Sequence, residues 1–188
     1  MFPLLSTLKH QLNGRKWGYV IFRCTYGDDA SWDRFMAYLQ AKVRDALETE
    51  GADDMYEQLD WKVQEDMSLW DASPETVKTR FQEWLKEHED DDSVVGTRSH
   101  ACIMIDRAVL DALEDLHDDI DVEDYDESGA IWVHMISSYE VEKPTRVGVD
   151  YLIPTAYTEI ELDGWYNVEL QEGEDVARPG AWGRYVED

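Results

Sequence analysis

The segment that most restricts the fold covers residues 17–26 (WGYVIFRCTY), which combine aromatic and β-branched side chains with almost no polar alternation. This composition favours a β-strand, and a strand that is apolar on both sides is typical of a sheet interior. A chain built around this strand needs cover on both faces of its sheet. Arg23 is the one charged residue in the segment.

Two helices and a further strand follow. Asp28 or Asp29 can cap a helix whose apolar residues recur at three- and four-residue spacing until Gly51 ends it. A second helix begins at residues 73–74, where a capping serine precedes a proline at the first helical position. Between the helices, residues 59–64 alternate apolar and polar side chains. This alternation predicts an edge strand with one face in water.

Three more strands are predicted, over residues 99–105, 130–139 and 164–170, because each run is rich in β-branched or aromatic side chains. Asp106 is expected to cap a short helix after the first of them. Parallel strands need a long crossover connection, and this helix is short for the purpose.

The remaining segments are expected to be irregular. Residues 1–15 are predicted to be a loose N-terminal segment, and residues 171–188 a coil tail rich in glycine. Pro144 and Pro154 indicate an irregular connection before the last strand. With no repeat or linker in the sequence, residues 1–188 are expected to form a single domain.

The order of these elements predicts an α+β fold. Helices are few and the last strands follow one another, so we expect an antiparallel sheet with helices on one face, as in a ferredoxin-like sandwich. The alternative is a three-layer α/β arrangement with a doubly wound parallel sheet.

The chain of 188 residues carries 43 acidic and 17 basic side chains, for a formal charge of −26. Nucleic acids and anionic membranes are bound by basic patches, so neither is an expected partner. An acidic surface keeps a protein soluble, and it also suits a basic protein partner, including one that the chain would bind as an acidic mimic. No segment has the apolar length of a membrane span or a signal peptide, so a cytoplasmic protein is expected.

Side chains alternate across a strand, which divides each strand into two sets. In three of the predicted strands one set is purely apolar, while the other contains Arg23, His100 and His134. If these three share a face, Arg23 could hold an anion and either histidine could transfer a proton near neutral pH. The competing interpretation is structural, with Arg23 in an ion pair and both histidines hydrogen-bonded and partly buried.

The second face is also largely apolar and would not be stable in water without cover. The C-terminal segment, a second copy of the chain in a homodimer, or a small-molecule ligand would each cover it. Tyr19, Trp132 and Trp165, with Arg23 and His134, are therefore the predicted ligand-binding residues.

Metal and cofactor signals are weak. Asp124, Asp126 and Ser128 match the opening of a calcium loop, but Met135 stands at the twelfth position, where a bidentate glutamate is required. His88 and His117 lie beside acidic residues without zinc-site spacing. The chain has no serine-hydrolase, P-loop or dinucleotide motif, and we expect no cofactor.

Cys24 and Cys102 both lie within predicted strands. A cysteine in the middle of a strand is more often a small core residue than a nucleophile, which would need an exposed thiolate and a nearby base. Both are expected to be buried thiols.

Residues 17–29 (WGYVIFRCTYGDD), followed by Trp32 and Phe35, resemble the opening of a family of uncharacterised proteins from filamentous fungi. The resemblance is specific over about the first 35 residues of the folded part and looser near Gly164 and Trp165. It implies a fungal, intracellular protein. No activity is established for that family, so the resemblance assigns no catalytic residue.

Three hypotheses of function follow from these observations. The first is a non-catalytic module that binds a ligand or a protein through an aromatic sheet face. The second is a metal-independent enzyme in which Arg23 holds an anion and His134 or His100 acts as acid and base. The third is an acidic mimic that occupies a basic protein. The sequence does not decide whether the protein is an enzyme.

Overall fold

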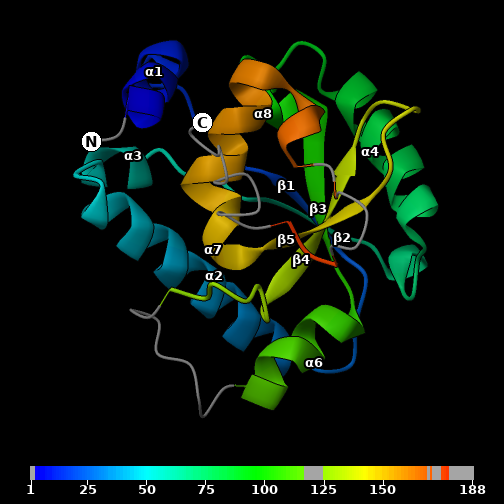
Figure 1. Cartoon of the computed structure of the whole chain (residues 1–188). Coiled ribbons are helices and arrows are strands. Elements are labelled where there is room, and N and C mark those ends of the chain that lie inside the picture. The colour runs from blue at the N-terminus through cyan, green and yellow to red at the C-terminus, as the bar shows by residue number, and fades with distance from the viewer. Residues whose placement is uncertain (1–2, 117–124, 169, 171–174, 178–188) are drawn as a thin grey trace, which may run out of the picture.

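The computed structural model has five strands in one mixed sheet, in the order β2-β1-β3-β4-β5 (Figure 1). It describes residues 3–116, 125–168, 170 and 175–177. β1 pairs in parallel with both β2 and β3, whereas β4 runs antiparallel to β3 and β5. The bounds of the strands are Val20–Arg23 for β1, Lys62–Glu65 for β2, Ala101–Ile105 for β3, Trp132–Ser137 for β4 and Thr145–Gly148 for β5.

Helices lie on both sides of this sheet. Figure 1 shows α4 on one side and α2, α7 and α8 on the other. The bounds of the helices are Pro3–Leu12 for α1, Asp29–Thr49 for α2, Asp53–Tyr56 for α3, Pro74–Glu87 for α4, Thr97–His100 for α5, Arg107–Leu116 for α6, Val149–Tyr151 for α7 and Tyr157–Asp163 for α8. Short 3-10 turns occur at Met67–Leu69 (η1) and Trp165–Asn167 (η3), and a π-type turn at Leu152–Ala156 (η2). No helix in these ranges has the length and apolarity needed to cross a membrane.

The α+β class is confirmed, but the prediction of an antiparallel sheet is wrong. Two long helices, α2 and α4, each lie between consecutive strands of the β1, β2 and β3 set. Such helical crossovers allow neighbouring strands to run in parallel. The doubly wound parallel sheet is not formed either, because β4 and β5 follow one another as antiparallel neighbours.

The two faces of the sheet are covered by separate apolar clusters. The larger one includes Ile21, Ile103 and Val133 from the sheet and is covered by α1, α2, α6 and α8. The smaller one includes Phe22 and Met104 and is covered mainly by α4. The prediction that helices cover only one face of the sheet is therefore wrong, because α4 covers the second face.

Two segments differ from their predicted structure. The N-terminal segment is a helix over Pro3–Leu12, because Leu5, Leu8 and Leu12 have helical spacing and are buried. The described residues of 164–170 do not form the expected strand, since Trp165 and Val168 are buried three residues apart, a spacing that fits the 3-10 turn η3. The fifth strand of the sheet is instead β5, which lies in the segment around Pro144 that was expected to be irregular.

Candidate functional site

The chain adds β2 on one side of β1 and β3 on the other, and this reversal of strand order makes the end of β1 a natural place for a site. β2 lies on one side of β1 and β3 on the other, while α2 and α4 cover opposite faces. In open α/β sheets, ligands bind beyond the carboxyl ends of strands at such a switch point. Residues 24–29 follow β1 at this edge, and residues 106–107 follow β3.

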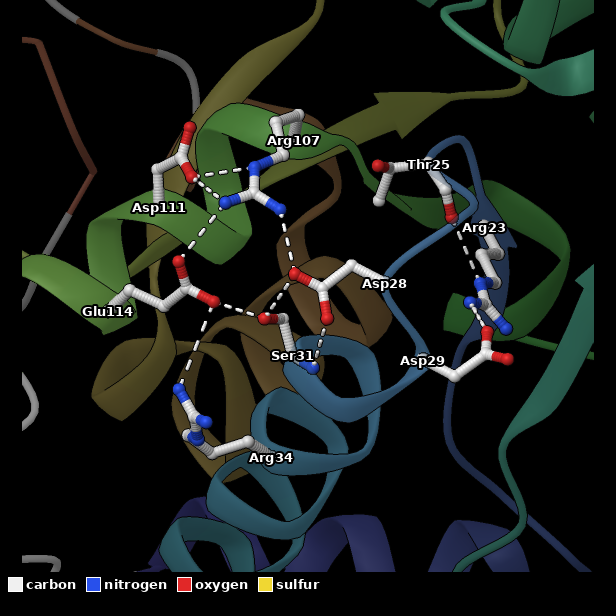
Figure 2. Close-up of polar contacts among 9 residues, drawn as sticks. All are labelled: Arg23, Thr25, Asp28, Asp29, Ser31, Arg34, Arg107, Asp111 and Glu114. Atoms are coloured by element: carbon white, nitrogen blue, oxygen red, sulfur yellow. Dashed lines mark hydrogen bonds and ion pairs between the residues drawn. The ribbon is translucent and has the colours of Figure 1, made fainter.

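Arg23 occupies the end of β1 and is almost fully buried. Its guanidinium donates to the backbone oxygen of Thr25 at 3.0 Å and to Asp29 at 2.5 Å (Figure 2). The guanidinium also donates to Glu65 at 2.9 Å. It also lies over the ring of Trp32, 4.7 Å from the centroid. Two carboxylates already neutralise this one cation, so no charge is left to hold an anionic ligand.

A second polar network joins the beginning of α2 to side chains along α6 (Figure 2). The Ser31 hydroxyl bridges the carboxylates of Asp28 and Glu114. Arg107 contacts Asp28 and Glu114, each at 3.1 Å, and Asp111 at 2.6 Å. Hydrogen bonds from the backbone amide and hydroxyl of Ser31, and the contact with Arg107, lower the pKa of Asp28. The groups satisfy one another, which favours a structural link between the two helices.

The side chain of His134 lies on the α4 face of the sheet, opposite to the face of Arg23. Its Nε2 is hydrogen-bonded to Asp106 at 3.0 Å, and its ring packs edge-on against Trp132. The Arg146 guanidinium lies 4.3 Å from the centroid of the Trp132 ring. Burial of the Asp106 carboxyl acts to raise its pKa, but the bond from His134 and backbone amide bonds outweigh it, and the net shift is downward.

The residues predicted to act together are not brought together. Strand register places Arg23 opposite Ile105 and His134 opposite Met104, so their side chains point to opposite faces. His100 precedes β3 and packs against the ring of Tyr139. The geometric basis for an enzyme that combines Arg23 with either histidine is therefore missing.

The predicted ligand-binding residues are also divided. Tyr19 and Trp165 are buried in the larger core beneath the helices, while Trp132 is only partly buried. These residues do not line one surface, and the ligand-binding roles of the individual residues remain predictions. The second face is packed by the chain's own helix rather than left open for a planar guest.

The remaining candidates have structural surroundings. Burial, with a smaller effect from Asp106, raises the pKa of the Cys24 thiol to about 12, and burial raises that of Cys102 well above its usual value. Asp126 accepts hydrogen bonds from Ser128 and from the amide of Ile131, as a turn-capping carboxylate does.

Metal ligands do not converge in the part of the chain that the structure describes, where no group of three histidine, cysteine or carboxylate side chains could hold an ion. Asp124 and His117 lie outside the described residues. His88 stacks on Trp84 and its Nδ1 lies 2.8 Å from the Trp84 backbone oxygen, an arrangement that fits the end of α4.

A pocket of about 240 Å³ opens between α4 and the β1–β2 part of the sheet. Its apolar side is formed by Phe22, Leu69 and Trp84, all of them nearly buried. Its polar side is formed by Gln64, Glu65, Asp66, Arg80, Glu83 and Glu87.

The charges around this pocket are unbalanced. Glu65 is paired with Arg23, as described above. Arg80 is shared by Asp66 at 2.8 Å and Glu83 at 3.2 Å. Glu87 has no ion-pair partner among the described residues. Asp66 and Glu83 therefore share a single guanidinium, and Glu87 adds a third carboxylate to the lining, beside the nearly buried rings of Phe22 and Trp84.

Sequence reasoning missed this pocket. Arg80, Glu83 and Glu87 recur at the three- and four-residue spacing of one helix face, next to Trp84. That pattern was the available signal for a charged face along α4, but nothing in it shows which strand the face meets.

Comparison with known proteins adds no relative: no protein-family model matches the chain, and neither a curated protein nor a solved structure does. The resemblance of residues 17–29 to filamentous-fungal proteins stays a prediction. The function is therefore inferred from the fold and from the geometry of the pocket.

Proposed function

We propose that the protein is a non-catalytic binding module whose pocket between β2 and α4 takes a cationic side chain, arginine or lysine, from a basic protein partner. The observation that carries this proposal is the excess of carboxylates around a pocket with an aromatic wall. Asp66 and Glu83 share one cation, Arg80, and Glu87 lines the same pocket without an ion-pair partner among the described residues.

The chemistry of the pocket suits a guanidinium or an ammonium group. Carboxylates accept hydrogen bonds from either group, and they bind the planar guanidinium with two parallel bonds. The Trp84 ring closes the apolar side of the pocket, where it is 6% exposed and stacks against Phe81 and His88. A second positive charge would relieve the repulsion between carboxylates that Arg80 only partly neutralises.

The charge of the whole chain supports a basic partner. A formal charge of −26 attracts cationic proteins over distances of about a Debye length and raises the rate of encounter. The net charge alone does not choose a place on the surface. The pocket does, because it combines a concave apolar wall with unpaired acid.

The test is calorimetric titration with acetyl-arginine amide, with acetyl-citrulline amide as its neutral analogue. Replacing Glu83 and Glu87 together by glutamine should weaken acetyl-arginine amide binding about fivefold, since exposed charges contribute about 0.5 kcal/mol each and the two together about 1 kcal/mol. The matched control replaces Asp33 by asparagine and Glu48 by glutamine. Both are exposed on α2, across the sheet, and the control removes the same two charges.

The two variants separate a pocket from a diffuse acidic surface. The control should bind acetyl-arginine amide as the original protein does. Equal weakening by both pairs, or equal binding of the citrulline compound, would show that the pocket has no particular affinity for a cation.

A further inference from the structure

The two edges of the sheet differ in how the chain completes them. At the β5 edge, Ala177 lies beside the strand, where its amide donates to the Arg146 oxygen at 2.7 Å and its oxygen accepts from Gly148 at 2.9 Å. At the other edge, β2 pairs with β1 alone within the described ranges. One edge is therefore closed by the chain, while the other presents a free strand.

The free groups on β2 can be identified from the ladder. The Lys62 amide donates to the Tyr19 oxygen at 3.1 Å, so Lys62 and Gln64 turn their backbone groups toward β1. Backbone groups alternate in direction along a strand, which turns those of Val63 and Glu65 outward. No hydrogen bond to these outward groups occurs in the described part of the chain.

Natural sheets usually protect such an edge with charged side chains, but here those charges are engaged elsewhere. The Lys62 ammonium contacts Asp60 at 3.0 Å, and Glu65 turns to Arg23. Val63 is 36% exposed, and Met67 and Trp70 just beyond the strand are 59% and 58% exposed. The edge thus offers unpaired backbone groups next to apolar surface.

The acidic pocket lies along this same strand. Gln64 is paired in register with Phe22, and both line the pocket on the α4 side of the sheet. A strand added beside β2 would place alternate side chains on that side, one strand spacing of about 4.8 Å farther out. Basic side chains at alternate positions would meet the carboxylates of Asp66, Glu83 and Glu87.

We infer that the partner is an extended basic segment of another protein, which adds a strand to the β2 edge and directs alternate arginine or lysine side chains into the pocket. Strand addition of this kind takes affinity from backbone hydrogen bonds and specificity from alternate side chains. This inference rests on the proposed function, since it specifies that the cationic side chains belong to an extended segment of the partner.

The experiment uses a seven-residue peptide of alternating valine and arginine, capped at both ends. Val63→Pro removes the outward amide of β2, and it leaves the β1–β2 ladder intact because that amide is not used there. The variant should bind the peptide at least about tenfold more weakly, a loss of the kind expected for backbone bonds in strand addition. Its affinity for acetyl-arginine amide should stay unchanged.

A second measurement does not depend on the folding of the variant. The same peptide with N-methyl groups on alternate residues cannot donate to the β2 edge, and it should bind the unaltered protein at least about tenfold more weakly than the parent peptide. A peptide of equal composition with its arginines grouped at one end should also bind more weakly.

The outcomes separate the two proposals. Equal affinity for the parent and N-methylated peptides would overturn strand addition while leaving the cation pocket in place. Loss of acetyl-arginine amide binding on replacing Glu83 and Glu87, together with these peptide differences, would support both. If those replacements affect neither ligand, the pocket itself is disproved.

Discussion

At the scale of single residues, Arg23 is explained by structure rather than by ligand binding. Its side chain is 8% exposed, whereas its partners Asp29 and Glu65 are 83% and 55% exposed. The guanidinium therefore fixes the end of β1 by bonding to Thr25 and packing over two rings, those of Tyr26 and Trp32. The two carboxylates reach it from water.

A structural role for Arg23 predicts that its replacement lowers the stability of the protein. Arg23→Met should lower the free energy of unfolding by about 1–3 kcal/mol, because it removes charge-assisted bonds and ring contacts from a buried position. Arg34→Met is the matched control, since Arg34 is 49% exposed and lies 3.8 Å from Glu114. The control should change stability by less than about 0.5 kcal/mol. Urea unfolding measures both, and equal effects would contradict the assignment.

At the scale of elements, α4 decides the architecture. It packs Val77, Phe81 and Trp84 against the sheet face that carries Phe22 and Met104, and its outer side forms one wall of the pocket. Phe81 lies at the centre, edge-on to Phe22 and stacked with Trp84. The helix thus serves the core with one side and the acidic site with the other.

Phe81→Ala should therefore be strongly destabilising. Phe81 is fully buried, and removal of such a ring costs about 3–5 kcal/mol through lost burial and the cavity left behind. Val141→Ala is the comparison, because Val141 is 89% exposed. It should be nearly neutral. Thermal unfolding of the two variants measures the difference, and a similar midpoint for both would show that α4 does not seal this face.

Sequence patterns predicted the elements better than their assembly. Caps were predicted at Asp28 or Asp29, at Ser73 and at Asp106. The structure has them at Asp28, Ser73 and Asp106, since a local side chain satisfies a free amide at the start of each helix. The direction of a strand, by contrast, depends on where the preceding helix places it in the sheet. No local sequence pattern predicts that position.

The candidate site was the least predictable part. Parity along single strands allowed Arg23 and His134 to share a face, but a shift of one residue in register reverses the face, and the observed register separates them. The pocket residues Asp66 and Glu87 lie 21 residues apart in the numbering, and only the placement of α4 over the sheet brings them into one pocket.

At the scale of the whole molecule, a strongly acidic chain has a pocket in which carboxylates lie beside aromatic side chains. Long-range attraction brings a basic partner to any part of such a surface, and added salt weakens it. Local contacts must then select the pocket. The proposed function therefore requires that a cation binds in the pocket and not merely somewhere on the acidic surface.

The most direct measurement is an NMR titration with arginine amide in which the indole N–H signals of the tryptophans are followed. Trp84 lines the pocket, Trp132 lies on β4 beyond it, and Trp165 is buried across the sheet. The account predicts a saturating shift of the Trp84 signal with little change at the other two. A Trp84 signal that stays still, or shifts of equal size at all three, would contradict it.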